Sequence, residues 1–91
     1  MTLRDGPPLV DVRAEADFLL AHAPRAAGIP LEELAGRTHE LPPREARVCV
    51  TDADPRRAEE AAAFLRLRGH AVTVVGWDAA AATESGPSHL C

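Results

Sequence analysis

A strand–helix–strand pattern in the second half of the chain constrains the fold more than any other feature. A β-branched run over 47–51 precedes a helix with clear boundary signals, and a valine-rich strand over 72–75 follows it. Asp54 is a candidate N-cap, Pro55 takes the first helical position and Gly69 follows the last. Because strands joined by one helix pair in parallel, this unit predicts an α/β fold.

The first half of the chain shows the same alternation in shorter pieces. Phe18 and Leu19 fall on one face of a short amphipathic helix, and Pro30 confines its extended segment to a sheet edge or a strand start. The other expected elements are a strand over 9–12, a helix over 14–21, an extended piece over 28–31 leading into a helical turn that Gly36 ends, a loop over 37–47 and a last helix over 76–82.

These elements predict a three-layer α/β/α architecture with a small parallel sheet of about four strands and a site at the carboxyl ends of those strands. The chain has 91 residues, which is enough for one domain. We expect that domain over 1–82 and a flexible tail over 83–91.

The charge balance argues against several classes of partner. Fourteen acidic residues outnumber ten arginines, and lysine, asparagine, glutamine and tyrosine are absent. Without a basic patch we expect no nucleic-acid or membrane-surface partner. No signal peptide or membrane-length span is found, so a cytoplasmic location is expected, and the missing amides hint at a thermophilic source.

The two cysteines have different surroundings. Cys49 lies within an apolar run, which indicates a small buried hydrophobe, whereas Cys91 ends a polar tail without activating groups. They are a poor disulfide pair. The histidines show no spacing typical of metal ligands, so neither a metal nor another cofactor is expected.

The motifs of the chain carry a family resemblance. DVR at 11–13, Glu15, Phe18 and the string HAPRAAGIPL at 22–31 match residue by residue the rhodanese signature DVR…EF…GHIPGAINIPL. The second half resembles the family's strand, six-residue loop and helix, written VVYCxxGxRS and ending in glycine. The resemblance spans most of the chain, although the family's usual first strand and helix, which precede the DVR strand, look shortened here.

The resemblance implies where the active-site loop lies. Counting back twelve residues from Gly69 puts Arg57 on the family's loop arginine, and five more put Asp52 on its cysteine. In active members, backbone N–H groups of this loop lower the pKa of the thiol and hold an anionic persulfide. The equivalent loop here consists of Asp52, Ala53, Asp54, Pro55, Arg56 and Arg57.

Three residues of this loop oppose sulfur chemistry. Asp52 cannot form a persulfide, Asp54 adds a second negative charge, and Pro55 lacks an N–H. We therefore expect no thiosulfate sulfurtransferase activity. The order Asp52-Ala53-Asp54 also mimics the DxD motif of haloacid-dehalogenase-type phosphatases, but those enzymes need a lysine, and a helix cap with a solvated acid explains the two carboxylates better.

Four further side chains are expected to support the fold around this loop. Asp11 and Arg13 flank the end of the first strand and are expected to form a structural ion pair, and His22 matches the family's turn histidine, which bonds neighbouring backbone. Trp77 stands where the family has the second glycine of a pair, and either covers the site or packs on the sheet edge.

Two functions stay open from the sequence. The first is a non-catalytic rhodanese-like binding or regulatory module in sulfur metabolism or a stress response, with an unidentified protein partner and a monomeric or weakly dimeric state. The alternative is a thiosulfate or persulfide sulfurtransferase, or a sulfur carrier, that uses Cys91 or Cys49.

Overall fold

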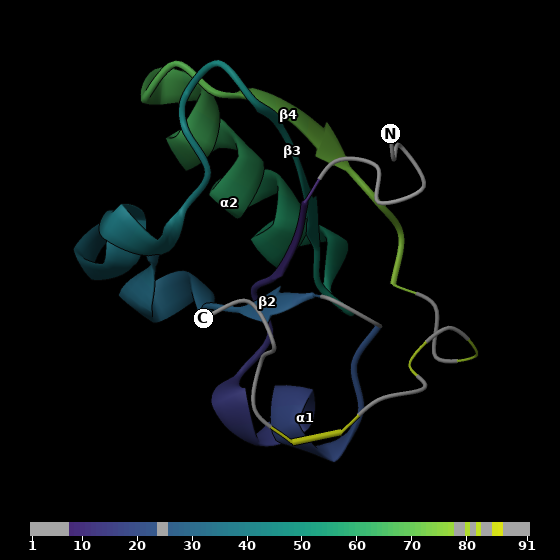
Figure 1. Ribbon diagram of the computed structural model, residues 1–91. Helices are drawn as coiled ribbons and strands as arrows, with labels where there is room; N and C mark the ends of the chain where they lie inside the picture. Colours follow the sequence, from purple (N-terminus) through teal and green to yellow (C-terminus); the bar gives the residue numbers. More distant parts are fainter. Residues whose placement is uncertain (1–7, 24–25, 78–79, 81, 83–84, 87–91) are drawn as a thin grey trace, which may run out of the picture.

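The computed structural model describes residues 8–23, 26–77, 80, 82 and 85–86. The elements follow the order β1 (Leu9–Asp11), α1 (Glu15–Leu20), β2 (Ala27–Gly28), η2 (Leu31–Glu40), β3 (Arg47–Thr51), α2 (Pro55–Leu67) and β4 (Ala71–Val74) (Figure 1). The strands form one parallel sheet in the order β2-β1-β3-β4. The predicted α/β fold with about four parallel strands is confirmed.

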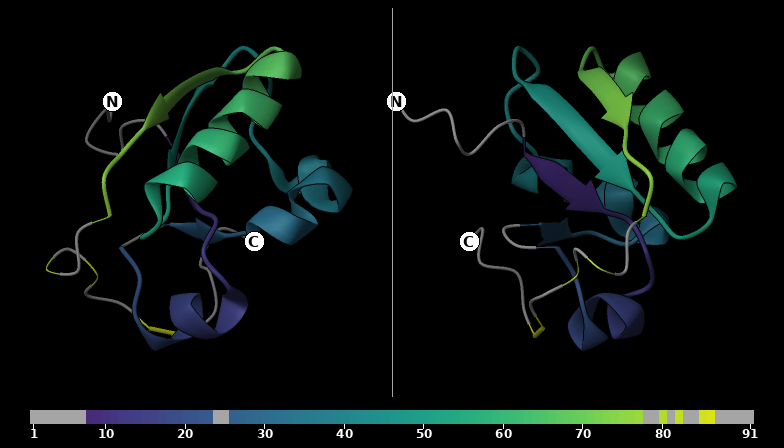
Figure 2. Two further views of the ribbon diagram at one scale, coloured as in Figure 1. Left: turned by 180° about the vertical axis from the view of Figure 1, so that it is seen from behind. Right: turned by 90° about the vertical axis from the view of Figure 1, so that its right-hand side faces the viewer.

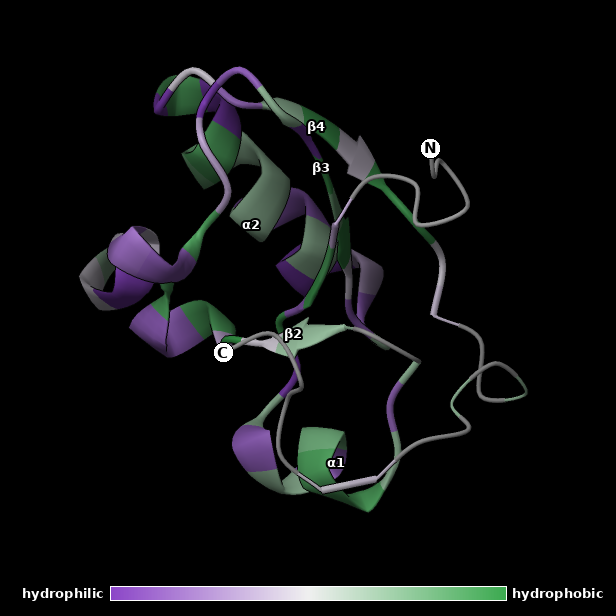
Figure 3. Ribbon diagram, in the orientation of Figure 1, coloured by the Kyte–Doolittle hydropathy of each residue, from purple (hydrophilic) through white to green (hydrophobic). Residues whose placement is uncertain are grey.

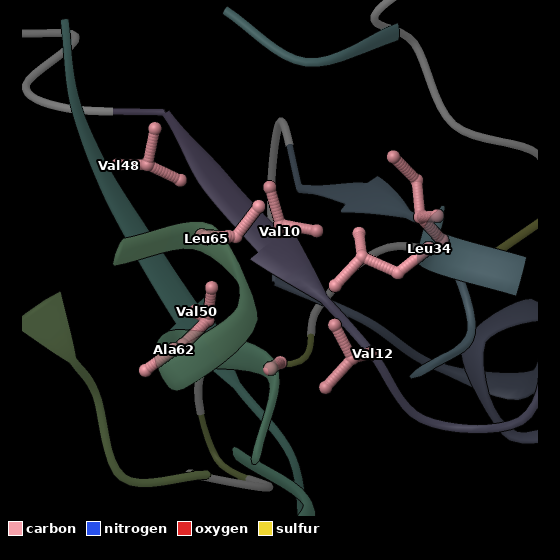
Figure 4. Close-up of a cluster of buried hydrophobic side chains, with 9 residues drawn as sticks. Val10, Val12, Leu34, Val48, Val50, Ala62 and Leu65 are labelled. Carbon is pink, nitrogen blue, oxygen red and sulfur yellow. The ribbon is translucent and has the colours of Figure 1, made fainter. Parts of the chain in front are cut away.

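One face of the sheet packs against α2 and η2 (Figure 2). Successive side chains of a strand point to opposite faces, so the even-numbered residues of β1 and β3 meet α2. Figure 4 shows this contact, in which valines of both strands lie against Ala62 and Leu65 of α2 and Leu34 of η2. The buried sheet residues of this cluster are Val10, Val12, Val48 and Val50.

The helix α1 lies on the other face of the sheet, at the carboxyl end of β1 and β2 (Figure 2). Gly28 pairs with Asp11 and shares its face, which is opposite to that of Val10. A Cβ on Gly28 would lie 2.7 Å from the ring of Phe18, so the glycine lets α1 approach the strand closely. Helices therefore lie on both faces, as the sequence predicted.

The boundaries of α2 agree with the sequence signals. The side chain of Asp54 accepts a hydrogen bond from the Arg56 N–H, and Pro55 is the first helical residue. Gly69 has a φ of 101°, which ends the helix in a conformation that favours glycine. The N-cap, the proline and the glycine therefore predicted both ends of α2 correctly.

Two expectations about the helices were wrong. Gly36 does not end the helical turn: η2 continues to Glu40 through a kink at Arg37, whose φ is −122°. Arg37 donates to Glu33 and Glu40, and these ion pairs span the kink. Figure 3 shows the polar character of this outer segment, which had suggested a loop.

The other wrong expectation is the start of the last helix, because Gly76 is irregular rather than helical and so is Trp77. Much of 76–82 and of the expected tail over 83–91 lies outside the described residues, as does Pro24. Within the tail, Gly86 donates its N–H to the carbonyl of Leu19 at 2.9 Å. No helix among the described residues is long and apolar enough to cross a membrane.

Candidate functional site

The carboxyl ends of the strands gather the polar side chains singled out in the sequence. Asp52 directly follows β3 and is only 6% exposed, so the expectation of a solvated acid at this position was wrong. One carboxylate oxygen of Asp52 (Oδ1) accepts the Asp54 N–H at 2.8 Å, and the other (Oδ2) accepts the Arg57 Nε–H at 3.0 Å. Both carboxylate oxygens of this buried acid are therefore hydrogen-bonded within the chain.

Arg57 is the centre of a network that joins four parts of the fold. Its Nε donates to Asp52, its Nη1 to Glu32, and its Nη2 to Glu32 and, at 3.0 Å, to the carbonyl of Val12. Glu32 raises the pKa of Arg57 above its ordinary value, with Asp52 as the next cause. Arg57 in turn lowers the pKa of Glu32. The guanidinium therefore stays charged and tied to β1, η2 and the loop.

The backbone N–H groups of the loop are also occupied. The Asp54 N–H donates to Asp52, and the Arg56 N–H donates to the Asp54 carboxylate at 2.9 Å. The N–H groups of Arg57 and Ala58 donate to the Asp54 carbonyl, and Pro55 has none to offer. Among residues 53–58 only the Ala53 N–H is left without a hydrogen bond to a described residue. The start of α2 thus satisfies its own donors.

Asp11 and Arg13 form a buried, bidentate ion pair. Arg13 Nε lies 3.0 Å from both carboxylate oxygens of Asp11, and Nη2 lies 2.9 Å from one of them. Nη2 also donates to the Ala21 carbonyl at 2.6 Å, and the guanidinium carbon stands 3.7 Å above the ring of Trp77. The pair therefore clamps β1 to the end of α1 and to the segment after β4.

His22 lies within the packing around α1. It is 1% exposed, its Nδ1 is 2.8 Å from the Phe18 carbonyl, and its ring stacks on that of Phe18 with centroids 3.9 Å apart. Both contacts are made with a residue one helical turn earlier. The arrangement fixes the chain after α1.

Cys49 lies in the sheet and not in the loop. It is half-buried, and it shares a face with Leu9 and Thr73, its partners on the neighbouring strands. That face is opposite to the one shared by Val50 and Asp52, so the thiol does not point into the loop. Cys91 is outside the described residues. Within the described part of the chain, no group of three His, Cys, Asp or Glu side chains could hold a metal ion.

Sequence reasoning missed Glu32. It lies 25 residues before Arg57, and its side chain is 66% exposed. No local motif marks it, because an acid in the first turn of a helix is common for electrostatic reasons alone. Only the parallel order of β1, β2 and β3 brings η2 beside the start of α2.

The fold and the site define a class of protein. It is a small parallel α/β domain with a polar loop between its central strand and the following helix. The family model described as "Rhodanese-like domain" matches residues 2–82. The chain belongs to this family. No curated protein matches it.

Solved structures agree with this assignment. Over 97% of its length the chain resembles a thiosulfate sulfurtransferase from Pseudomonas aeruginosa, with a TM-score of 0.83 and 28% identity. It also resembles the reduced CoADR-RHD of Bacillus anthracis over 80% of its length, with a TM-score of 0.71 and 29% identity. The chain spans only 18% and 13% of these two proteins.

A rhodanese-related protein from Thermoplasma volcanium is closer in size. The match covers 81% of this chain and 73% of that one, with a TM-score of 0.72 and 23% identity. It supports the fold alone.

Proposed function

We propose that this chain is a rhodanese-like domain without sulfurtransferase activity, in which Asp52 stands at the nucleophile position, and that it serves as a binding or regulatory module in a sulfur-related process. Its family and its likeness to a thiosulfate sulfurtransferase support the sulfur-related part. The replacement of the nucleophile rests on the motif alignment, which puts Asp52 where a cysteine is expected.

The observation that carries the proposal is the occupation of Arg57. All three of its side-chain nitrogens donate to groups of the chain, and two of these acceptors are the carboxylates of Asp52 and Glu32. A persulfide or sulfonate would have to displace a carboxylate from the arginine. It would also sit near negative charges, at a cost of roughly 1–4 kcal/mol for a charge about 4 Å away.

The loop backbone supports the same conclusion. A persulfide-binding loop needs several free N–H groups, because they offset its negative charge. Here Asp52 and Asp54 accept two of them, and Pro55 removes a third. The Asp52 carboxylate thus fills the place of a bound anion with a group that cannot accept sulfur.

The test is thiocyanate production from thiosulfate and cyanide by the full chain. We expect no turnover above the uncatalysed rate, and no mass gain of one sulfur after incubation with thiosulfate. The variants Cys49→Ala and Cys91→Ala test the alternative function, in which one of these thiols carries sulfur. Turnover or sulfur addition that disappears in either variant would establish that alternative and end the proposal.

A gain-of-function series sharpens the test. We expect the triple variant Asp52→Cys/Asp54→Ser/Pro55→Gly to take up one sulfur at position 52, because it restores the thiol, frees the N–H of residue 54 and adds an N–H at residue 55. The serine hydroxyl keeps the helix cap on the Arg56 N–H. Asp52→Ser is the matched control, since it removes the carboxylate without adding a thiol. If the triple variant stays inert while its circular dichroism remains native, the loop account is wrong.

A further inference from the structure

The strand β4 is an open edge of the sheet among the described residues. The strand order places it at one end, with β3 as its only described neighbour (Figures 1 and 2). An open edge exposes backbone N–H and C=O groups, which another strand can bind. Natural edges are commonly blocked by Lys, Pro or inward-pointing charge, and β4 has none of these.

The backbone hydrogen bonds between β3 and β4 identify the outward-facing groups of β4. The Val75 N–H donates to the Val50 carbonyl of β3, so residues 71, 73 and 75 direct their backbone groups inward. Val72 and Val74 therefore direct theirs outward. Arg66 Nη2 reaches the Val72 carbonyl at 3.0 Å, which agrees with this assignment. Within the described parts of the chain, the N–H of Val72 and both backbone groups of Val74 have no hydrogen-bond partner.

We propose that β4 pairs antiparallel with β4 of a second copy of this chain, around a two-fold axis at Thr73. In this register Val72 of one copy lies opposite Val74 of the other. Each such pair exchanges two hydrogen bonds, so the two pairs satisfy the free outward-facing groups of both strands. The Val72 carbonyl accepts the bond from the second copy with the lone pair that Arg66 does not use. The interface is self-complementary, as a two-fold dimer requires.

The side chains of β4 and α2 suit a second copy. Ala71–Val74 contains no charged residue, and the axis places exposed Thr73 against its own copy, a favourable cross-strand pair. Arg47 of the neighbouring strand lies 3.5 Å from the Thr73 hydroxyl and places a positive charge near the axis. On α2, Glu59 lies two turns before Arg66 on the same stripe, and both are exposed. The same axis runs the two α2 helices antiparallel, which brings the acidic part of one stripe toward the basic part of the other.

The test combines charge substitution with measurement of the oligomeric state. Thr73→Glu and Thr73→Lys each place like charges opposite one another at the axis, and we expect each to weaken the dimer in sedimentation equilibrium. The loss should be at least several-fold for Thr73→Lys and smaller for Thr73→Glu, because Arg47 lies beside position 73. An equimolar mixture of the two variants should restore dimers. Ala35→Glu and Ala35→Lys, which change the charge of exposed η2, serve as controls with an unchanged dimer.

Amide hydrogen exchange of the unmodified chain provides a second readout. The amides of Val72 and Val74 should exchange more slowly as the protein concentration rises, since only the dimer protects them. Protection that is independent of concentration would mean that other residues of the same chain cover this edge, and would overturn the proposal. A chain that stays monomeric, or a dimer indifferent to charge at Thr73, would do the same.

Discussion

Buried ionisable side chains at the two ends of the sheet have opposite surroundings. At the carboxyl end Asp11 and Asp52 are buried, and each accepts hydrogen bonds from an arginine and a backbone N–H. At the amino end of β4, His70 is 5% exposed, and neither ring nitrogen has a hydrogen-bond partner among the described residues. The comparison separates polar burial that stabilises from polar burial that costs free energy.

The surroundings of His70 explain its electrostatics. Burial lowers the pKa of His70 below its ordinary value of 6.5, and the positive charges of Arg68 and Arg44 lower it further. Glu45 acts in the opposite direction and has the smallest effect of the four. His70 is therefore a neutral, buried ring at neutral pH, while Asp11 and Asp52 at the other end each accept hydrogen bonds from an arginine.

Loss of the Asp11 carboxylate is the largest expected effect. Asp11→Ala leaves the guanidinium of Arg13 buried, with the Ala21 carbonyl and the Trp77 ring as its remaining partners among the described residues. We expect a loss of about 3–5 kcal/mol in the free energy of unfolding. Urea unfolding followed by circular dichroism measures it. Glu60→Ala removes an exposed acid and should change little.

The double variant Asp11→Leu/Arg13→Met tests the cause of that loss. Because it removes both charges from the same space, it should be more stable than Asp11→Ala. If Asp11→Ala lowers the free energy of unfolding no more than Glu60→Ala does, the ion pair of Asp11 and Arg13 does not stabilise the fold.

Crowding at Gly28 is expected to have the next largest effect. Gly28→Ala places a Cβ 2.7–2.8 Å from three ring atoms of Phe18, and overpacking of this kind costs about 1–3 kcal/mol. Gly36→Ala is the matched control, because a Cβ there meets nothing within 4 Å. Adding Phe18→Leu to Gly28→Ala should recover part of the loss in urea unfolding. Equal stabilities of the two glycine variants would contradict the close contact between α1 and β2.

The features that depend on neighbouring residues are the ones that the sequence could predict. Local signals located β3, the cap at Asp54, and α2, because the residues that set these boundaries are neighbours in the chain. The ion pair of Asp11 and Arg13 was foreseen for the same reason, since the two residues are two apart.

What the sequence did not predict depends on distant contacts. Glu32 meets Arg57 only through the order of the strands. The continuation of η2 beyond Gly36 depends on Arg37 bridging acids on both sides of a kink, and its polar composition resembled that of a loop. The open edge at β4 likewise follows from topology and not from any motif.

Replacement of His70, whose buried ring lacks hydrogen bonds to the described residues, should stabilise the protein. His70→Leu replaces a buried ring that lacks hydrogen bonds with an apolar side chain, and we expect a gain on the order of 1 kcal/mol at pH 7. The folded-state pKa is lowered, so the unfolded chain binds more protons below pH 6.5. Stability is therefore fully present above that pH and is lost as the pH falls.

Urea midpoints between pH 7.5 and 5 measure this dependence. The unmodified chain should lose more stability over this range than His70→Leu does. His39→Ala is the control, because it removes a histidine whose side chain is 75% exposed and leaves the buried His70 in place. An identical pH dependence in His70→Leu and the unmodified chain would show that His70 does not titrate differently in the folded state.

The helix cap at Asp54 is the smallest effect and the one that tests how independent the loop contacts are. Asp54→Ala removes the acceptor for the Arg56 N–H at the exposed start of α2, and we expect a loss of about 1 kcal/mol, since caps contribute this much in many helices. Asp54→Ser keeps an acceptor without the charge and should recover most of it. Urea unfolding of both variants, alone and combined with Asp11→Ala, shows whether the losses add. They should, because Asp54 and Asp11 share no hydrogen-bond partner. A combined loss far from the sum would mean that the carboxyl end of the sheet acts as one coupled network.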